Sequence, residues 1–485
     1  MRFLELIRDL EDIQPVSGLK DFQVGGVTCD SKKIKDNFIF VAIKGSSCDG
    51  HRFIPEAISA GAKAVVVENP EVEKRQGCVF LKTKDSRRCL AQLVAAFYGF
   101  PSRYLKLVGV TGTNGKTSIT YILESILKEA GFNPGVIGTV NYRYNAQAIP
   151  SFNTTPGPED LERLFYQMLK AGVSHVVMEV SSHALSQQRV SGISFSAGIF
   201  TNLTQDHLDY HKDLEDYFSC KARLFEMLDK DSYAFINIDD AFGRRLIHLT
   251  PAKVVTYGIE NKADVLAVNI TCDGKLSKFC LQHGKNKVLI TSPLIGRHNV
   301  YNVLAAASFA LKEGIGPAVI QAAIEKCTFI PGRLQRVDVE ADFSVFVDYA
   351  HTEDALRNVI LSLRQIYPKR IIVVFGCGGN RDKDKRPKMG KVVTELADFA
   401  FVTSDNPRSE DPREIINQIL AGITKENYCV VVDRRQAIDK ALQIAQPGDC
   451  VLVAGKGHES YQIIGAEVIP FDDCEVVKSC LQLKS

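Results

Sequence analysis

The stretch Val108-Gly109-Val110-Thr111-Gly112-Thr113-Asn114-Gly115-Lys116-Thr117 joins an apolar run, 104–110, to an amphipathic run, 118–130. In the second run, apolar residues recur at the i, i+3, i+4, i+7 spacing of one helix face, and Gly131 follows as a stop signal. A strand, a glycine loop ending in Lys-Thr and a helix can hold phosphate, because glycines let backbone N–H groups approach an anion closely. We expect Lys116 to supply a positive charge and the Thr117 hydroxyl to bind a magnesium ion.

The loop departs from the strict phosphate-loop pattern. That pattern, G-x-x-x-x-G-K-[ST], would place its first glycine at position 110, where the chain has Val110. The match is therefore the shortened form Gly112-x-x-Gly115-Lys116-Thr117. The alternative is a helix-capping turn that carries a surface lysine, but the elements on either side favour phosphate binding.

Composition indicates a globular protein of two to four domains. The chain has 485 residues, of which 45% are hydrophobic and 24% charged, and its net charge is +2. This balance gives no general attraction to nucleic acid. No apolar run reaches the ~18 residues of a membrane span. The segment 1–13 carries several acidic residues and does not resemble a signal peptide. Thirteen cysteines without a C-x-x-C pair fit free thiols in a reducing compartment. We expect a cytoplasmic monomer that binds small molecules, and neither nucleic acid nor a membrane.

Three zones follow one another along the chain, at 1–102, 103–333 and 334–485. We expect an α/β fold in each: a small α/β N-terminal domain, a central α/β domain of the phosphate-loop ATPase type and a Rossmann-like α/β C-terminal domain. In the third zone, helical patterns separate apolar strand candidates at 370–375, 399–403 and 450–454. This alternation predicts a parallel sheet.

Polar loops follow these strand candidates directly, at 376–382, 404–408 and 455–459. Ligands of parallel sheets bind at the carboxyl ends of the strands, where these loops lie. Together the loops offer Arg381, Arg408 and several acidic and amide groups. Guanidinium groups bind carboxylates and acids bind ammonium groups, so this set suits a zwitterionic ligand. A nicotinamide site is the alternative, but Gly376-x-Gly378-x-x-Arg381 lacks the third glycine of that motif.

The middle zone contains candidates for metal binding. Glu179 lies at the carboxyl end of a strand-like apolar run, and a carboxylate there commonly serves magnesium in phosphate-loop proteins, although an exposed strand-end glutamate is the alternative. His207 and His211 have the spacing of a zinc-protease pair, but Leu208 stands where such a protease needs glutamate. Lys221, on a helical run, would by itself be interpreted as a solvated lysine.

Ordered motifs along almost the whole chain resemble those of the Mur ligases, the ATP-dependent amino-acid-adding enzymes of peptidoglycan synthesis. Besides the phosphate loop, they are Cys29-Asp30-Ser31, Asp49-Gly50-His51, Asn153-Thr154-Thr155, Glu179-Val180-Ser181-Ser182-His183, Asp206-His207-Leu208-Asp209-Tyr210-His211, Gly296-Arg297-His298-Asn299, Gly332-Arg333, Asp348-Tyr349-Ala350-His351, Gly378-Gly379-Asn380-Arg381, Asp405-Asn406-Pro407-Arg408 and Gly455-Lys456-Gly457-His458-Glu459. Two positions depart from the family pattern: Glu353 stands where relatives often have proline, and Asn380 replaces a frequent aspartate.

The resemblance implies a set of site residues for each ligand. ATP is expected on Gly112, Thr113, Asn114, Gly115, Lys116 and Thr117, with Asn299, Arg333 and Asp348 nearby. The uridine nucleotide is expected in the first domain on Cys29, Ser31, Ser46, Ser47 and Cys48, and the muramyl peptide on Asn153, Thr154, Thr155, Ser181, Gln187 and Arg189. The incoming amino acid is expected on Arg381, Asp405, Asn406, Pro407, Arg408, Gly455 and Glu459. Magnesium is implied on Thr117, Glu179, His207 and Lys221 as its carbamate, and the implied catalytic residues are Lys116, His207 and Lys221.

The resemblance also implies the reaction. It is the ATP-dependent addition of meso-diaminopimelate to UDP-N-acetylmuramoyl-L-alanyl-D-glutamate through an acyl phosphate, and Arg408 in Asp-Asn-Pro-Arg indicates diaminopimelate, whose second carboxylate it can bind bidentately. The alternatives are the same reaction with L-lysine, a ligase like folylpolyglutamate synthase, or a nucleotide switch that hydrolyses ATP to move a partner. Because acyl phosphates hydrolyse, we expect the third domain to close over the second and exclude water.

Overall fold

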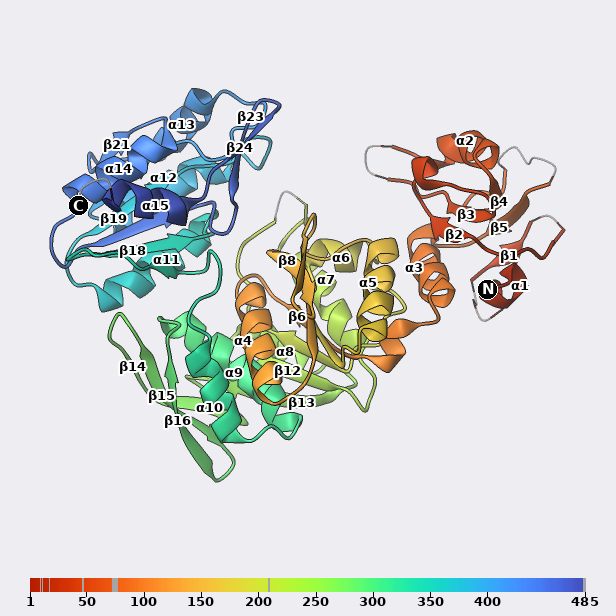
Figure 1. The fold of residues 1–485 in the computed structure, drawn as a ribbon, viewed down its shortest axis with the longest axis horizontal. Coiled ribbons are helices and arrows are strands. Elements are labelled where there is room, and N and C mark those ends of the chain that lie inside the picture. Colours follow the sequence, from red (N-terminus) through yellow and green to blue (C-terminus); the bar gives the residue numbers. More distant parts are fainter. Residues whose placement is uncertain are drawn as a thin grey trace.

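The computed structural model describes residues 1–485 except 9, 11, 17, 46–47, 72–76, 208–209 and 483–485. Figure 1 shows three α/β bodies that follow one another, with the N-terminus in a small body at one end and the C-terminus in a body at the other. The predicted class, α/β in three parts, is therefore confirmed. The candidate residues Ser46 and Ser47 lie outside the described part of the chain. Within that part, no helix combines the length and the apolar character needed to cross a bilayer.

The N-terminal body is built on a five-stranded sheet in the order β1-β5-β4-β3-β2, parallel except for β1. Its strands are β1 (Gln14–Pro15), β2 (Gly26–Thr28), β3 (Phe38–Val41), β4 (Ala62–Val67) and β5 (Val79–Lys82). Its helices are α1 (Phe3–Ile7), α2 (Ile54–Ser59) and α3 (Ser86–Phe97), with short 3₁₀ turns at Ser31–Lys33, Gly50–Phe53 and Pro101–Tyr104. Figure 1 shows α3 on the side nearest the central body.

The central body contains an eleven-stranded sheet in the order β16-β15-β14-β13-β12-β11-β6-β10-β7-β8-β9. Its strands are β6 (Lys106–Thr111), β7 (Pro134–Ile137), β8 (Asn141–Tyr144), β9 (Gln147–Pro150), β10 (His175–Glu179), β11 (Ala197–Phe200), β12 (Tyr233–Asn237), β13 (Lys253–Gly258), β14 (Val265–Cys272), β15 (Ser277–His283) and β16 (Asn286–Ser292). The seven strands from β7 to β14 in the sheet order are parallel, whereas β8–β9 and β15–β16 extend the two edges with antiparallel strands.

Helices cover both faces of the central sheet. They are α4 (Lys116–Glu129), α5 (Pro158–Lys170), α6 (Ser182–Ser186), α7 (Leu214–Glu226), α8 (Ala241–Leu246), α9 (Arg297–Lys312) and α10 (Pro317–Lys326). The alternation of side chains on β6 explains the two layers: Val108 and Val110 pack with α4, α9 and α10, while Leu107 packs with α5, α7 and α8. Because both faces are covered, the strands are apolar along their length, which is the pattern of a buried parallel sheet.

The C-terminal body has a six-stranded sheet in the order β17-β18-β22-β19-β20-β21. Its strands are β17 (Gln335–Val337), β18 (Ser344–Asp348), β19 (Ile371–Phe375), β20 (Phe399–Val402), β21 (Tyr428–Val430) and β22 (Cys450–Ala454), and its helices are α11 (Glu353–Ile366), α12 (Lys385–Leu396), α13 (Pro412–Leu420), α14 (Arg434–Ile444) and α15 (Asp473–Gln482). The predicted parallel sheet is present, but β17 adds an antiparallel edge and β23 (Tyr461–Ile464) with β24 (Glu467–Pro470) forms a separate hairpin.

The phosphate loop takes its shape from two glycines. β6 ends at Thr111 and α4 begins at Lys116, two residues before the predicted helical run, because Gly115 caps the helix in a left-handed conformation with φ 92°. Gly112 has φ 145°, and a Cβ atom there would overlap the Thr201 side chain. Both positions therefore require glycine, which allows the backbone to turn tightly between β6 and α4.

Candidate functional site

A cavity of about 690 Å³ opens above the carboxyl ends of the central strands, between the central and C-terminal bodies. The phosphate loop, the ends of β10 to β12 and the start of α9 form its central side, and Arg333, Asp348 and α11 form the other. Parallel sheets bind ligands at this edge, so the strand order itself accounts for the position of the cavity.

Two lysines converge on one carbonyl oxygen of the phosphate loop. Lys116 Nζ donates to the carbonyls of Gly112 and Thr113, both at 2.9 Å, and Lys221 Nζ donates to the Gly112 carbonyl at 2.9 Å. Burial lowers the pKa of Lys116, and burial together with the charge of Lys116 lowers the pKa of Lys221 well below its usual value. An anion placed here would therefore relieve the repulsion between the two amines.

The position of Lys221 rules out its interpretation as a solvated lysine. The residue is 1% exposed, and its Nζ lies 4.3 Å from the centre of the Tyr217 ring. Helix α7 turns this side chain toward the core, because Lys221 is four residues after Tyr217 and three before Leu224, both of which are buried. A lowered pKa favours the uncharged form of the amine, which has a nucleophilic lone pair.

Oxygen donors gather around Glu179 at the end of β10. Its carboxylate accepts hydrogen bonds from the Thr117 hydroxyl at 3.0 Å and from the backbone N–H and hydroxyl of Thr139 at 2.8 and 3.0 Å. Glu179 is 1% exposed, so the strand-end glutamate is not simply a surface residue. Buried carboxylate and hydroxyl oxygens are the donors that Mg²⁺ prefers, so this chemistry fits the ion.

His207 lines the same cavity from the loop before α7. Partial burial, together with the charge of Lys116, lowers the pKa of His207 to about 4, so its ring is neutral at neutral pH and can act as a metal ligand. Its backbone φ of 55° is left-handed, and its backbone N–H donates to the Asp206 carboxylate at 2.8 Å. The pair His207 and His211 does not lie on a helix, which removes the geometry that a zinc protease needs.

Arg333 and Asp348 bring the C-terminal body to the cavity. Arg333 Nη2 donates to the Thr117 hydroxyl at 3.2 Å, its guanidinium lies 4.8 Å from the centre of the Tyr349 ring, and its buried Nε has no hydrogen-bond partner. Asp348 accepts hydrogen bonds from the backbone N–H groups of Leu334 and Ala350 at 2.5 and 2.7 Å, which fixes the segment that carries Arg333. A buried guanidinium N–H without a partner, on a side chain that contacts Thr117, suits an anionic ligand.

Asn299, which the family resemblance also implied, is buried at the start of α9 and lines the cavity. Its side chain donates to the Ile295 carbonyl at 2.9 Å and accepts from Asn302 at 3.0 Å. Sequence reasoning gave no role to many other lining residues, although His298 and His351 lie within recognised motifs. They include Asn202, Thr204, Asp239, His298, Tyr301, His351, Asp354 and Asn358.

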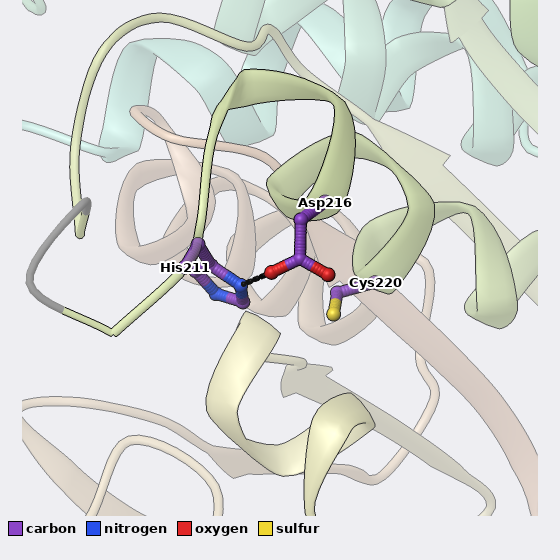
Figure 2. Close-up of side chains that lie close together, drawn as sticks. All are labelled: His211, Asp216 and Cys220. Carbon is purple, nitrogen blue, oxygen red and sulfur yellow. Dashed lines mark hydrogen bonds and ion pairs between the residues drawn. The ribbon is translucent and has the colours of Figure 1, made fainter.

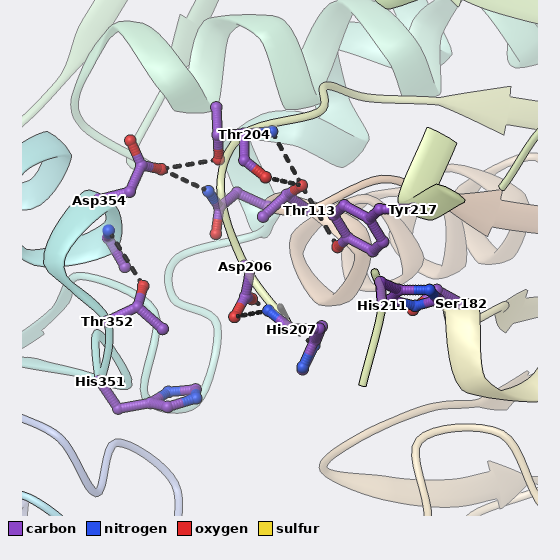
Figure 3. Close-up of polar contacts among 12 residues, drawn as sticks. Thr113, Ser182, Thr204, Asp206, His207, His211, Tyr217, His351, Thr352 and Asp354 are labelled. Carbon is purple, nitrogen blue, oxygen red and sulfur yellow. Dashed lines mark hydrogen bonds and ion pairs between the residues drawn. The ribbon is translucent and has the colours of Figure 1, made fainter. Parts of the chain in front are cut away.

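Figure 3 shows the polar contacts that join these elements around the phosphate loop. The Thr113 hydroxyl accepts from the backbone N–H of Thr204 at 3.0 Å and donates to the Tyr217 hydroxyl at 3.4 Å. Asp354, from α11, accepts from the Thr204 hydroxyl at 2.8 Å. The loop is thus connected on one side to α7 and on the other to the C-terminal body.

A second cluster lies beside the cavity, around the loop that follows β9. Thr155 donates through its hydroxyl to the Glu179 carbonyl at 2.8 Å and accepts from the backbone N–H of Ser181 at 3.0 Å. Arg189 donates to the Thr155 carbonyl at 2.8 Å and to the side chain of Gln187 at 2.7 Å. Their neighbours in this cluster are Asn153, whose carbonyl accepts from Tyr142 at 2.6 Å, and Thr154, whose hydroxyl lies 3.1 Å from that of Thr139.

The three described first-zone candidates lie in the N-terminal body, apart from the cavity lining. The backbone N–H of Cys29 donates to Glu159 of α5 at 3.0 Å, and the hydroxyl of Thr28 donates to the same carboxylate at 2.7 Å. Burial raises the pKa of Cys29 to about 12, so its thiol stays protonated. Ser31 begins a 3₁₀ turn, and Cys48 is exposed. Glu159 therefore links the loop after β2 directly to the central body.

The candidates of the third zone form their own cluster at the strand ends of the C-terminal sheet. Asn406 donates to the Glu459 carboxylate at 2.7 Å, and Arg408 donates to the Gly379 carbonyl at 2.8 Å. Burial and the nearby Asp405 carboxylate raise the pKa of Glu459. The remaining candidates are Arg381, which is exposed, and Pro407 and Gly455, which are buried.

Sequence reasoning missed Lys456 in this cluster, although it lies within a recognised motif. Lys456 is fully buried, and its Nζ donates to the Tyr461 carbonyl at 2.5 Å and to Glu459 at 3.4 Å.

The structure accommodates both departures from the family pattern locally. Glu353 is the first residue of α11, after the capping Thr352, and Asn380 accepts from the backbone N–H and hydroxyl of Ser409 at 3.2 and 2.9 Å.

Comparisons with known proteins agree with this architecture. Family models match as the Mur ligase family catalytic domain at 23–98, the Mur ligase middle domain at 110–310 and the Mur ligase glutamate ligase domain at 332–457. A protein of Syntrophomonas wolfei named UDP-N-acetylmuramoyl-L-alanyl-D-glutamate--2,6-diaminopimelate ligase is 42% identical over 100% of both chains. A protein of the same name from Caldanaerobacter subterraneus is 44% identical over 99% of both.

Solved structures agree as well. The structure of a ligase with the same name is 31% identical, with a TM-score of 0.71 over 100% of this chain and 99% of the other. A MurF ligase of Thermotoga maritima in complex with ADP, 18% identical, has a TM-score of 0.64 over 95% of this chain and 98% of the other, which shows a shared fold. The chain belongs to the Mur ligase family. It is an ATP-dependent ligase that forms an amide bond.

Proposed function

We propose that this Mur ligase adds meso-diaminopimelate to UDP-N-acetylmuramoyl-L-alanyl-D-glutamate in peptidoglycan synthesis. The full-length relatives with 42% and 44% identity carry the name of that reaction. The single observation that carries the proposal is the cavity in which Lys116, the Thr117–Glu179 pair and Arg333 meet. It joins a phosphate-binding loop to a carboxylate and hydroxyl pair suited to a divalent ion, as phosphoryl transfer to an acid requires.

The residues of the cavity suit activation of a carboxylate. A carboxylate does not react with an amine at neutral pH, because oxide is a very poor leaving group, so the terminal phosphoryl group of ATP is transferred to it first. The amine then attacks the acyl phosphate, and phosphate leaves as the amide bond forms. Lys116, Arg333 and the N-terminus of α4 offset the repulsion between the two anions that must meet.

Thr117, Glu179 and His207 are the residues that would hold Mg²⁺. When bound, the ion supplies positive charge to the phosphate oxygens as charge develops. Lys221 is proposed to react with carbon dioxide through its uncharged amine, forming an N–C bond and losing a proton to solvent. The resulting carbamate adds a negative charge on which a second ion can be held, and the depressed pKa of Lys221 supports this role.

The substrates are proposed to extend across the three bodies, taken as domains 1–102, 103–333 and 334–485. ATP is assigned to the phosphate loop with Asn299, Arg333 and Asp348. The uridine nucleotide is assigned to Cys29, Ser31, Cys48 and residues 46–47, and the muramyl dipeptide to the cluster around Thr155 and Arg189. The first of these clusters contacts Glu159 of α5 and the second contacts Glu179, which supports one continuous path. We also infer a cytoplasmic monomer, for which the thirteen free cysteines are supporting evidence of a reducing compartment.

The amino acid is assigned to the C-terminal cluster of Arg381, Asp405, Asn406, Pro407, Arg408, Gly455 and Glu459. Diaminopimelate carries a carboxylate at the end where lysine carries only its amine, and Arg408 is the guanidinium proposed to bind it. Its present partner is a neutral carbonyl, Gly379, so exchange for a carboxylate would strengthen the contact.

Phosphate release tests this function. The full chain is incubated with ATP, Mg²⁺ and the muramyl dipeptide, and meso-diaminopimelate, its LL isomer or L-lysine is added. We expect phosphate release only when the dipeptide and the amino acid are both present, and fastest with meso-diaminopimelate. Phosphate release in the absence of the dipeptide and the amino acid would indicate a nucleotide switch instead. Turnover with lysine as fast as with diaminopimelate would contradict the proposed amino-acid substrate.

A further inference from the structure

Three side chains that could bind a metal, each through a different element, lie close together at the start of α7, outside the residues assigned to catalysis. Asp216 and Cys220 are one helical turn apart on α7, and His211 lies just before the helix. One ligand atom from each lies within 4.8 Å of the others, and Figure 2 shows the Asp216 carboxylate between the imidazole and the sulfur. The fold therefore brings nitrogen, oxygen and sulfur donors to one point.

We propose that His211, Asp216 and Cys220 form a binding site for a borderline divalent cation such as Zn²⁺. His211 Nδ1 and Asp216 Oδ2 are 3.1 Å apart, close to the roughly 3.3 Å that separates two tetrahedral zinc ligands at about 2.0 Å from the metal. The thiolate and imidazole favour zinc over magnesium, which prefers oxygen donors. This set differs in chemistry from the oxygen-rich pair Thr117 and Glu179.

The surroundings of His211 prepare it for such a role. Nδ1–H can donate to Asp216, and Nε2 lies 3.0 Å from the Ser182 hydroxyl. When an ion displaces the Nδ1 proton, the Nδ1 lone pair can bind the ion while a proton on Nε2 is donated to Ser182. Metal-binding histidines commonly fix their second nitrogen in this way. As the sulfur–metal bond forms, the Cys220 thiol releases its proton to solvent and both bonding electrons come from sulfur.

Exposure supplies a route for the ion. The side chain of Asp216 is 47% exposed, whereas that of His211 is 1% exposed and Cys220 is buried. A cation can therefore reach the carboxylate from solvent and then contact the two buried donors, with water at the open side completing four ligands. Binding would tie α7, which carries Lys221 next to Cys220, to the loop that leads from His207.

Cobalt absorption tests the site on the full chain. With Mg²⁺ in excess, Co²⁺ is titrated in as a spectroscopic probe and then displaced with Zn²⁺. We expect one equivalent of Co²⁺ to give the near-ultraviolet band of a cobalt–thiolate bond, and Zn²⁺ to abolish the band and raise the melting temperature. No thiolate band at saturating Co²⁺ would overturn the proposal.

Variants identify the ligands. Cys220→Ala should abolish the band and Asp216→Asn should weaken Zn²⁺ binding by more than about 100-fold, since losing a ligand costs more than losing an outer hydrogen bond. Cys429→Ala, in the C-terminal body, is the matched control and should bind like the wild type. Because Asp216 is exposed, its variant remains informative if Cys220→Ala does not fold. Wild-type binding in both variants would contradict the site.

Discussion

Asp354 of α11 holds the phosphate loop from across the cavity: its carboxylate accepts hydrogen bonds from Asn114 Nδ2 at 3.3 Å and from the Thr204 hydroxyl at 2.8 Å (Figure 3). The two donors belong to the central body and the acceptor to the C-terminal body. One carboxylate therefore couples the loop that binds nucleotide to the body that is proposed to deliver the amino acid.

Asp354→Ala should weaken nucleotide binding and disturb the closing of the C-terminal body. Losing hydrogen bonds to a charged group corresponds to about 1.4 kcal/mol or more, so we expect the KM for ATP to rise about tenfold. Small-angle scattering with an ATP analogue and both substrates measures closure, and we expect less compaction than in the wild type. Glu395→Ala, on the same body, is the control. An unchanged KM together with unchanged scattering would refute the coupling.

Lys116→Ala should abolish turnover without unfolding the chain. The Lys116 amine donates to the loop carbonyls of Gly112 and Thr113, and without it no side chain at position 116 offsets the phosphate charge. Calorimetry with an ATP analogue and Mg²⁺ should show binding weakened at least about 100-fold, more than for Lys128→Ala on the exposed face of α4. Full activity of Lys116→Ala would eliminate the role assigned to it.

Lys221→Met should separate activity from stability. Burial lowers the folded-state pKa of Lys221 below that of the unfolded chain, so the unfolded chain binds more protons between the two values and wild-type stability rises with pH there. Methionine removes this slope, and we expect a melting temperature at pH 7 that is equal or higher, with kcat reduced at least about 100-fold. Lys230→Met, on an exposed lysine, should change neither.

Carbon dioxide should control the same residue. Thorough removal of dissolved carbon dioxide should lower wild-type activity and added bicarbonate should restore it, while carbon-13 bicarbonate should give a carbamate resonance that Lys221→Met lacks. Activity that is insensitive to bicarbonate, without such a resonance, would argue against the carbamate.

Arg408→Ala should act on the amino acid alone. Loss of a bidentate contact to a carboxylate corresponds to about 1.5–3 kcal/mol, so the KM for meso-diaminopimelate should rise about 10- to 100-fold while the KM for ATP stays the same. Steady-state phosphate release measures both constants, and Arg413→Ala, exposed on α13, is the control. An equal rise in the KM values for lysine and diaminopimelate would show that Arg408 does not bind the second carboxylate.

The pattern of apolar residues predicted the parallel strands well. Both faces of such strands are buried, so their sequences are continuous apolar runs. The strand predicted at 450–454 coincides with β22, and the helix predicted at 118–130 differs from α4 only at its ends. The hairpins β8–β9, β15–β16 and β23–β24 were missed, because half-exposed strands carry a weaker signal and join the fold through distant partners.

The site was predicted unevenly for a physical reason. The burial of Lys221 had a local signal that was overlooked, since it shares a helix face with the apolar Tyr217 and Leu224. Asp354 had no local signal, because its contact with Asn114 spans 240 residues of sequence. Arg333 was expected near ATP only through the family resemblance, because its contact with Thr117 spans 216 residues. Only the packing of one body on another reveals such contacts.

Glu159 has a consequence for which molecules can react. Its carboxylate fastens the loop after β2 to the central body, so the span from the proposed uridine contacts to Lys116 is set by the protein rather than by the ligand. The fixed distance between these two sites selects substrates by length. A nucleotide sugar without its dipeptide would bind at the uridine contacts, but its carboxylate would not reach the phosphoryl group at Lys116.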